Sequence, residues 1–509
     1  MQVINSLLNH ITMYRLMLYF LILLVGVATV ESALGILPYN PAEILFGVLY
    51  LAAICWLSNK ILAAIFRVKT NPESAFITGL ILSLIIGPAN WIPAFAGMAS
   101  NLLFLPAAGA LAMVSKYLIA WKGRHIFNPA AFGVVGTAIL LQQGASWWIG
   151  SPSMFPVLFL GGLLILRKLR RFTEVIVFII SMILIRFILN PFLTLSVFSV
   201  PTLFELTQYL VVSPIVFFAA IMLIEPQTSP LQSKYQILYA IIVAIFFYIF
   251  GNNLGVPYPL ELALLGGNIF SYMVSKSFRQ VMVLKEKKRL TEDVIAFLFE
   301  PSRKFQFKAG QFLEWTLAHP NPDNRGVRRF FTISSSPAED FVMLTSKFYE
   351  KPSTYKQALQ KLEPGDEIVI SGLGGEFTMP SDKSKKLVFI AGGIGVTPFR
   401  SMVKWIIDNN EKRDVVILYS NKTEGDIVFK EIFEKGEKVG VSTIYVNTDK
   451  DGYIDAEMIR NQVSDYRERM FYIAGPESMV EAFEGMLKGM GVAGIKKDYF
   501  PGYTETHQN

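Results

Sequence analysis

Long apolar stretches dominate the first 280 residues, and they constrain the fold more than any other feature. Ten of them are long enough, or nearly so, to cross the roughly 30 Å hydrocarbon core of a bilayer. They lie near residues 14–34, 42–66, 74–90, 94–120, 129–143, 154–168, 172–190, 208–224, 235–251 and 257–275. The third, fifth and sixth are short, and Gly, Pro and Asn in IIGPANWIP and HIFNPAAFG predict irregular backbone there. Residues 1–280 are therefore predicted to form a polytopic α-helical membrane bundle of about ten spans.

Charge divides the chain at the same place. Residues 1–280 hold 15 Lys and Arg against 7 Glu and no Asp, whereas residues 281–509 hold 32 basic and 33 acidic residues. Because the second part has no basic excess, no nucleic-acid partner is expected. Cys55 is the single cysteine. A cysteine-ligated iron–sulfur cluster, a CxxC zinc site and an internal disulfide are thereby excluded, and no metal site is predicted.

The positions of the cations predict an orientation in the membrane. The connections after even-numbered stretches contain Arg67, Lys69, Lys122, Arg124, Arg167, Lys168, Arg170, Arg171, Lys234, Lys276 and Arg279. Those after odd-numbered stretches, such as ESALGILPYNPAE and GNNLGVPYPLEL, contain no Lys or Arg. By the positive-inside rule, a multi-pass protein of the cell membrane with both termini in the cytoplasm is expected. The soluble part, from about Lys285 onward, then lies in the cytoplasm.

Two further domains are predicted after residue 280. Alternating runs such as DVIAFLFEP, QFLEWTLA and FVMLTSKF indicate a small antiparallel β-barrel over residues 281–384. Over residues 385–509 the runs LVFIAGG, VVILYSN, STIYVN and MFYIAGP are short buried strands separated by helical segments, which is typical of a doubly wound parallel α/β sheet. A barrel that holds a flavin and an α/β domain that presents a nicotinamide to it would explain this order.

The barrel contains the segment RRFFTISSSP. Positions two apart on a strand share a face, so Arg329 and Phe331 can meet the phosphate and the ring of a flavin together, with Thr332 directly after them. Alone, such a strand is usually ordinary barrel surface. Here AGQF precedes it and KPSTY follows, and both can supply backbone and hydroxyl contacts to the ring and the pyrophosphate.

The segment LVFIAGGIGVTPFRSM carries the strongest signal. A strand runs into Gly392, Gly393 and Gly395, which let the backbone approach a pyrophosphate, and Thr397 opens a helix whose N–H groups attract anions. YIAGPESMVEAF repeats the strand-to-turn pattern, so the two turns are expected to flank one dinucleotide. In the terminal KKDYFPGY, Asp498 and Phe500 are placed to close over the flavin, with Asp498 helping to position the nicotinamide.

These four motifs resemble the ferredoxin-NADP reductase family over about 220 residues. The resemblance implies FAD contacts for Arg329, Phe331 and Thr332, with Thr332 near flavin N5, and a pyrophosphate loop at Ser353 and Thr354. It implies nicotinamide-nucleotide contacts for Gly392, Gly393, Gly395, Thr397, Gly475 and Pro476. Two positions depart from the family pattern: Phe331 replaces the usual Tyr, and Ala474 replaces a frequent Cys. Neither abolishes flavin binding, but each can alter the hydride-transfer rate.

The first part has a relative too. SKYLIAWKGRHIFNPAAFG and MLIEPQTSP resemble two related membrane proteins, RnfD of the Rnf electron-transport complex and NqrB of the sodium-pumping NADH:quinone oxidoreductase. In those relatives membrane flavin carries electrons coupled to ion movement, and FMN is attached to a Thr. The corresponding segment here, GASWWIGSPSMFP, has no Thr. Covalent attachment of FMN is therefore not expected, and a flavin in the membrane domain would be bound non-covalently.

Four single polar residues in the bundle are candidate site residues, and three of them have two possible roles. His125 and Asn128 either cap a helix or line a flavin or ion site, and Glu225 either caps the EPQTSP turn or pairs with a cation or flavin. Arg186 is predicted inside a helix, where a charge is costly and function is the default interpretation.

Together these features predict a membrane-bound, flavin-dependent NAD(P)H oxidoreductase. Electrons pass from the nicotinamide through FAD to a quinone, a flavin or another redox acceptor, with possible ion transport and further electron-transport subunits. NADH is favoured over NADPH, because YSNKTEGDIVF lacks an arginine cluster for a 2′-phosphate. The alternatives are a flavocytochrome, which needs more haem ligands than His10 and His125 provide, and a non-redox transporter with a nucleotide-binding tail.

Overall fold

The computed structural model describes residues 8, 11–68, 72–88, 101–121, 124–189, 203–275 and 279–499. The chain divides into two compact units, which we call the helical unit (residues 11–277) and the sheet unit (from residue 278). Phe500, which was predicted to close over a flavin, lies outside the described residues.

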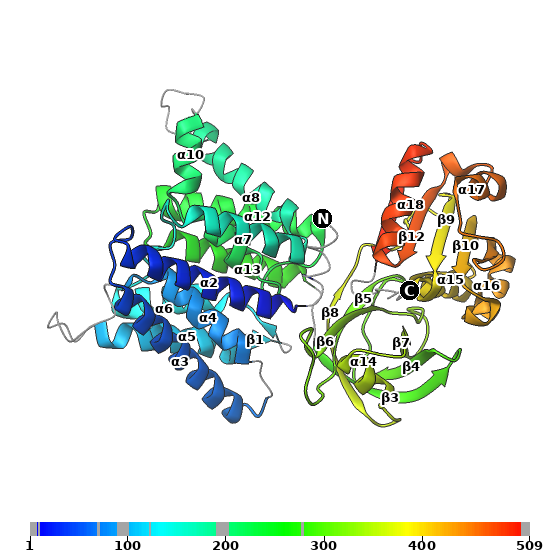
Figure 1. Ribbon diagram of the computed structural model, residues 1–509, viewed down its shortest axis with the longest axis horizontal. Coiled ribbons are helices and arrows are strands. Elements are labelled where there is room, and N and C mark those ends of the chain that lie inside the picture. Colours follow the sequence, from blue (N-terminus) through cyan, green and yellow to red (C-terminus); the bar gives the residue numbers. More distant parts are fainter. Residues whose placement is uncertain are drawn as a thin grey trace. The chain divides into compact units, whose positions relative to one another are not determined.

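A helix lies in each of the ten apolar stretches of the helical unit (Figure 1). The helices are α2 (Met13–Ala33), α3 (Pro41–Ile65), α4 (Pro72–Ile85), α5 (Asn101–Leu118), α6 (Pro129–Leu141), α7 (Phe155–Leu169), α8 (Phe172–Leu184), α10 (Leu203–Val211), α11 (Ile215–Phe217), α12 (Ser233–Tyr248) and α13 (Pro259–Val274). Three helices continue into π-helical turns, η3 (Ile185–Leu189) after α8, η4 (Phe218–Leu223) after α11 and η5 (Ile249–Asn253) after α12. A short hairpin of β1 (Ala120–Trp121) and β2 (Arg124–His125) precedes α6.

Asn-Pro pairs start two of these helices. Asn40 and Asn128 are the N-cap residues of α3 and α6, and their side chains accept hydrogen bonds from the backbone N–H groups of Ala42 (2.9 Å) and Ala131 (3.0 Å). Pro is suited to the first helical position, because its missing N–H would have no partner there. Asn128 is therefore a helix cap, which is one of its two predicted roles.

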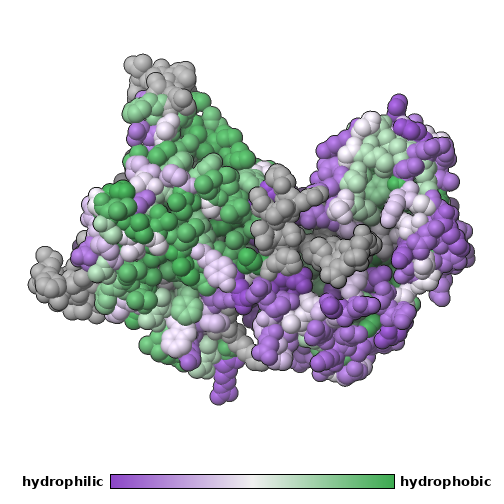
Figure 2. All heavy atoms as spheres, in the orientation of Figure 1, coloured by the Kyte–Doolittle hydropathy of each residue, from purple (hydrophilic) through white to green (hydrophobic). Residues whose placement is uncertain are grey.

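Three helices of the described residues are long and apolar enough to cross a membrane: α2, α3 and the segment Ser233–Gly251. The segments Phe204–Val211 and Ile215–Leu223 form a pair bent by 61°, which would make a fourth if it is one span. Large apolar side chains also cover the outer faces, among them Leu23, Leu49, Ile61, Leu140 and Leu160, each about half exposed or more. Figure 2 shows this apolar surface on the helical unit and a mainly hydrophilic surface on the sheet unit.

The first half of the sheet unit is a six-stranded antiparallel sheet. Its strands are β3 (Gln280–Arg289), β4 (Val294–Pro301), β5 (Phe312–Thr316), β6 (Arg328–Thr332), β7 (Val342–Lys347) and β8 (Glu367–Gly374), in the order β6-β5-β8-β3-β4-β7, with α14 (Thr354–Gln360) between β7 and β8. Its core holds Phe297, Phe299 and Trp315, which are fully buried. This is the antiparallel domain that the alternating runs predict.

The second half is a five-stranded parallel sheet in the order β11-β10-β9-β12-β13. The strands are β9 (Leu387–Gly392), β10 (Val415–Asn421), β11 (Val441–Asn447), β12 (Met470–Gly475) and β13 (Ile495–Tyr499), and the main helices are α15 (Thr397–Asp408), α16 (Lys430–Gly436), α17 (Ala456–Gln462) and α18 (Glu477–Gly489). Alternate side chains of β9 point to opposite faces, so Phe389 packs with α15 and α16 and Ile390 with α17 and α18. Helices thus cover both faces, as predicted.

Candidate functional site

Two glycine turns lie side by side at the carboxyl edge of the parallel sheet. The central strands β9 and β12 are neighbours and end at Gly392 and Gly475. A methyl group on Gly475 would lie 3.6 Å from the Cα of Gly392, and one on Gly395 would lie 2.3 Å from the carbonyl oxygen of Ala474. A side chain at Gly395 would therefore push the two turns apart.

The backbone at these turns opens two helices toward the same edge. Gly393 adopts a φ of +52°, which favours glycine, and Thr397 begins α15 directly after the turn. Pro476 is the N-cap residue of α18 after the second turn. Ligands of open α/β sheets bind at this edge, where backbone N–H groups meet phosphates. The structure thus brings together all six nicotinamide-nucleotide residues that the resemblance implies.

The antiparallel domain reaches this edge through Thr332, the last residue of β6. Its Oγ1 donates a hydrogen bond to Oδ2 of Asp498, at 3.5 Å. Asp498 lies on β13 opposite Ala474 of β12, one residue before Gly475. The two residues predicted to act at the reacting centre, from distant parts of the sequence, are therefore neighbours.

Arg329 and Phe331 share a face of β6 and meet at Tyr355. The guanidinium of Arg329 lies 5.0 Å from the centre of the Tyr355 ring, and the ring of Phe331 lies 6.0 Å from it. Arg329 is also held by its own loop, because Nη1 donates to the carbonyl oxygens of Arg325 (2.6 Å) and Gly326 (2.9 Å) and Nη2 donates to Oδ1 of Asp323 (3.2 Å). Much of its hydrogen-bonding capacity is therefore used within the protein.

The surroundings of Arg329 are basic. Burial, together with the charges of Arg325 and Arg329, lowers the pKa of Lys356 to about 8. Burial and Arg325 likewise lower the pKa of Arg329. Asp323 opposes them: although burial raises its pKa, the backbone N–H of Arg325 and the Arg329 guanidinium bring it below its usual value. Three crowded cations with one carboxylate favour a multiply charged anion such as a pyrophosphate.

The predicted pyrophosphate loop has an internal role as well. Ser353 caps α14 and accepts a hydrogen bond from the N–H of Lys356 at 3.3 Å. The Thr354 hydroxyl lies 3.1 Å from Nε2 of His319 and accepts a bond from the N–H of Asp323 at 2.9 Å. These bonds tie α14 to the loop before β6, the strand that carries Arg329. The cation cluster and the glycine turns together fit an FAD in the antiparallel domain and a dinucleotide on the parallel sheet.

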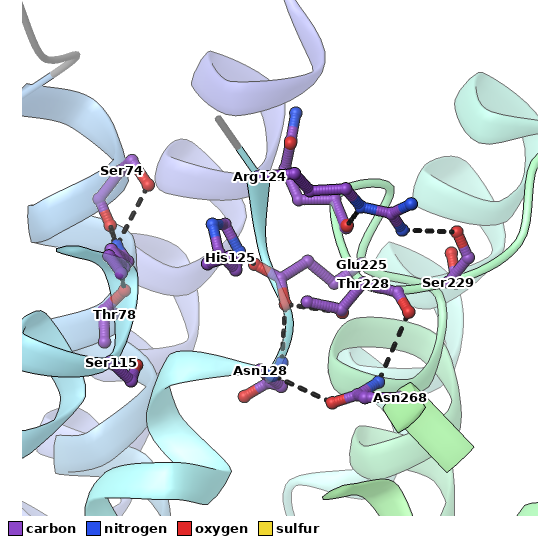
Figure 3. A network of polar contacts seen from close by, with 12 residues as sticks. Ser74, Thr78, Ser115, Arg124, His125, Asn128, Glu225, Thr228, Ser229 and Asn268 are labelled. Atoms are coloured by element: carbon purple, nitrogen blue, oxygen red, sulfur yellow. Dashed lines mark hydrogen bonds and ion pairs between the residues drawn. The ribbon is translucent and has the colours of Figure 1, made fainter. Parts of the chain in front are cut away.

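A second cluster of polar side chains lies inside the helical unit (Figure 3). Oε2 of Glu225 accepts hydrogen bonds from Nδ2 of Asn128 (3.0 Å) and Oγ1 of Thr228 (2.9 Å), and Nε2 of His125 lies 3.7 Å from Oε1 of Glu225. The fully buried Asn268 of α13 accepts a bond from the N–H of Asn128 at 2.8 Å. We call these five residues the Glu225 cluster. It contains three of the four residues that were predicted to line a site in the bundle.

A cavity of about 60 Å³ adjoins this cluster. Its wall includes Asn128 and Glu225 together with Ser74 and Thr78 of α4. Lys116 of α5 donates from Nζ to Ser74 Oγ (3.1 Å) and Thr78 Oγ1 (2.9 Å). Because about 15 Å³ of such volume suffices for one water molecule, the cavity can hold a few water molecules or one end of a larger ligand.

Arg186 was predicted to be buried inside a helix of the bundle; the helical placement is confirmed, but the burial is wrong. It lies in the π-helical turn η3 after α8, and its side chain is exposed. In an apolar run all positions look alike, so the sequence does not show which face a charge occupies. Arg186 makes no described contact with the Glu225 cluster.

Several site residues were missed by sequence reasoning. Lys116 is a lone cation in an apolar stretch, the same signal that drew attention to Arg186, and it could have been found. Asn268 and Lys356 carried no local signal, because their roles depend on segments distant in the sequence. Tyr355 belongs to the KPSTY segment, but its contact with Arg329 depends on tertiary packing.

Comparison with known proteins identifies the two halves of the sheet unit. Residues 281–379 match the family described as oxidoreductase FAD-binding domain, and residues 389–485 match the oxidoreductase NAD-binding domain. These matches confirm the predicted FAD and NAD(P)H cofactors and the oxidoreductase class.

Among curated proteins, the glycine betaine monooxygenase reductase subunit of Chromohalobacter salexigens is 30% identical over 228 residues, which is 42% of this chain and 60% of that protein. The flavohemoprotein of Bacillus subtilis is 25% identical over 227 residues, 42% of this chain and 56% of that protein. The chain thus covers about three fifths of the length of these relatives. Among solved structures, the Amycolatopsis cytochrome P450 reductase GcoB is 21% identical, with 44% of this chain and 70% of that chain covered and a TM-score of 0.40.

Proposed function

We propose that this protein is a membrane-bound NAD(P)H oxidoreductase that passes electrons from NADH through FAD into its helical unit. The contact between Thr332 and Asp498 carries this proposal, because it brings the end of the FAD-binding domain to the carboxyl edge of the NAD-binding sheet. NADH is proposed over NADPH. The segment after β10, NKTEGDIVF, contains no arginine that could pair with a 2′-phosphate.

The candidate site residues of the sheet unit then have the following proposed roles. Arg329, with Lys356 nearby, neutralises the pyrophosphate of FAD, and Phe331 packs against the flavin ring. Gly392, Gly395 and Gly475 let the dinucleotide backbone approach the sheet edge, and Asp498 positions the nicotinamide beside Thr332. When bound, FAD supplies the chemistry that turns hydride acceptance into release of electrons one or two at a time.

The helical unit is proposed to lie in the cell membrane with about ten spans and both termini in the cytoplasm. Its exposed apolar faces support this, since a soluble surface rarely carries so many large apolar side chains. The likeness to the RnfD and NqrB membrane proteins supports it too. A single helix would suffice as an anchor, so the remaining helices call for another function.

That function is electron transfer to an acceptor at or across the membrane. The Glu225 cluster and its cavity provide buried donors and acceptors for a non-covalent flavin or the head group of a quinone. Polar groups buried inside an apolar helical bundle are costly unless they are paired, so a cluster of them is a candidate site. Coupled movement of Na⁺ or H⁺, and further electron-transport subunits, belong to the same proposal.

Proteoliposomes that contain the full chain test this proposal. NADH is added outside, and reduction of a membrane quinone and of a trapped impermeant dye is followed. Glu225→Gln and Asn128→Ala should each lower these rates by about ten- to a hundredfold, because a bond to a charged group is worth roughly 1.5–3 kcal/mol. Reduction of an external dye by the sheet unit should stay unchanged.

Arg186→Leu is the matched control, since it removes a charge from the same unit outside the cluster. It should leave all three rates unchanged. The electron-transfer role fails if the wild-type protein oxidises NADH with an external dye but reduces neither the quinone nor the trapped dye, even with free flavin supplied.

A further inference from the structure

A buried ion pair joins the two halves of the sheet unit. Arg400 lies on α15 of the parallel domain, and Glu339 lies in the loop between β6 and β7 of the antiparallel domain. Nη2 of Arg400 donates to Oε1 of Glu339 at 2.8 Å, and Nη1 donates to Oε2. The two side chains are only 7% and 11% exposed. This is a two-pronged guanidinium–carboxylate contact, which fixes both distance and orientation.

The loop that carries Glu339 is held at further points. Nη1 of Arg400 also donates to the carbonyl oxygen of Ser334 (3.0 Å), and Oγ of Ser401 donates to that of Ser335 (2.6 Å). The N–H of Ser336 donates to Oε2 of Glu339 at 2.6 Å. All three loop serines are fully buried. We call Arg400, Ser401, Glu339 and this loop the interdomain latch.

The latch directly follows, in the sequence, the two segments proposed to hold the flavin and the nicotinamide. Ser334 follows Thr332 by two residues, and Arg400 follows Thr397 by three, which is one helical turn beyond the glycine-rich segment. The direct contact between the reacting ends, Thr332 to Asp498, is long at 3.5 Å. The latch therefore constrains the approach of the two domains more tightly than the site itself does.

Stability alone does not explain such a pair. Removing two charges from water costs about as much as their attraction returns, so apolar residues of similar volume often stabilise a fold equally well. What the ion pair adds is a fixed geometry. Hydride transfer depends on that geometry, and a misplacement of about 1 Å can cost about a hundredfold in rate.

We propose that Arg400 and Glu339 are positioning residues that set the distance between the nicotinamide and the flavin. This inference rests on the proposed function. In the step concerned, a hydride leaves C4 of NADH, which becomes NAD⁺, and reaches N5 of FAD, which also takes one proton from solvent. Neither residue touches the reacting atoms. Their effect is on the rate of this step and not on the affinity for either nucleotide.

The test uses the full chain with the double substitution Arg400→Met and Glu339→Leu, which leaves no unpaired buried charge. Anaerobic rapid mixing with NADH should show hydride transfer slowed by about ten- to a hundredfold. The FAD content and the dissociation constant for NADH should change less than about threefold. With NADH deuterated at C4, the isotope effect should rise, because hydride transfer becomes the slow step.

Hydrogen exchange supplies a readout that does not depend on activity. Amides of residues 334–343 should exchange faster in the double variant, while those of β9 and β12 stay protected. Glu339→Gln is the second variant: it keeps the shape but leaves the buried charge of Arg400 without its carboxylate, and it should slow hydride transfer in the same direction. The control is the double substitution Arg413→Met and Glu411→Leu. This ion pair is similarly buried and lies between α15 and β10, where Arg413 also donates to the carbonyl oxygen of Pro380. Its removal should leave hydride transfer unchanged.

The outcomes separate the two proposals. If the wild-type protein binds no FAD or does not oxidise NADH, the proposed function fails. If the wild-type protein is active and both latch variants transfer hydride at the wild-type rate, the positioning role is wrong. The positioning role would also be wrong if the variants lost FAD, or if weaker NADH binding explained the whole loss of rate. In either case the ion pair would have only a structural role.

Discussion

At the scale of single residues, Arg329 is proposed to bind a ligand, and it also holds the loop before its own strand, β6. Its guanidinium contacts Tyr355, Asp323 and two loop carbonyls, so it orders the segment that is proposed to face the pyrophosphate. Arg329→Ala is expected to weaken FAD binding by about ten- to a hundredfold, the equivalent of a charge-assisted hydrogen bond of roughly 1.5–3 kcal/mol. Equilibrium dialysis of FAD against purified protein measures this.

Arg328→Ala is the matched control for that change. Arg328 is the neighbouring residue on β6, and it lies 3.6 Å from Glu314, away from Tyr355. It should leave FAD affinity within about threefold, as expected for a partly exposed ion pair. Equal losses in the two variants would contradict the role of Arg329.

Lys356 predicts a pH dependence of FAD binding. Burial and two arginines lower its pKa from 10.5 to about 8, so it loses its charge above that pH in the FAD-free protein. FAD affinity should therefore fall by about three- to tenfold between pH 7 and about pH 9.5, as one attractive charge is lost. Lys356→Arg stays charged and should remove this dependence. A wild-type affinity that is constant over this range would contradict the assignment.

The contribution of Lys356 to the stability of the FAD-free protein should rise with pH, whereas FAD affinity falls. Between about pH 8 and 10.5 the unfolded chain keeps the Lys356 proton and the folded chain does not, so the unfolded state binds more protons. The contribution of Lys356 to the free energy of unfolding thus rises with pH in this window. Denaturant titrations of wild type and Lys356→Met at pH 7.5 and 10 separate it from other groups.

At the scale of elements, the two glycine turns form one nucleotide site only because β9 and β12 are adjacent. Gly395→Ala would place a methyl group 2.3 Å from the carbonyl oxygen of Ala474, so the turns must separate. We expect NADH affinity to fall by about tenfold or more while FAD remains bound, since close backbone approach to the pyrophosphate is lost. Gly485→Ala on α18 meets nothing within 4 Å and is the control. Titration with NADH gives the dissociation constant of each variant. Equal values for Gly395→Ala and Gly485→Ala would contradict the role of Gly395.

At the scale of the whole molecule, the sheet unit should function without the helical unit. It has its own cores, and both cofactor domains lie within residues 281–485. A fragment of residues 279–509, which keeps all of β3, is expected to be a yellow protein that oxidises NADH with an artificial dye. A folded but colourless fragment would contradict this.

An optical spectrum of the full chain tests the alternatives. Flavin bands without a Soret band agree with the proposed function, a Soret band would indicate a flavocytochrome, and neither would indicate a non-redox transporter. His125, one of the two histidines considered as haem ligands, lies beside Glu225, which favours the first outcome. Flavin in excess of the FAD of the sheet unit would place a second flavin in the helical unit.

Much of this protein follows from local sequence. Apolar length predicts where the helices of the first part lie, and alternation predicts the antiparallel and parallel sheets. Motifs such as GGIGVTP predict their sites because a glycine-rich turn between a strand and a helix has one strong use. Each of these patterns spans about ten to twenty neighbouring residues. The spacing of residues within such a window is enough to indicate a helix, a strand or a turn.

Contacts between distant segments were decided only by the tertiary structure. The latch pairs Glu339 with Arg400, 61 residues later, and the Glu225 cluster joins Asn128 to Glu225 across 97 residues. Arg186 shows the converse, since an apolar run predicts a helix but not the face that each residue occupies. A side chain's partners depend on how elements pack, and packing depends on many weak contacts summed over the fold. No single segment of the sequence contains that sum.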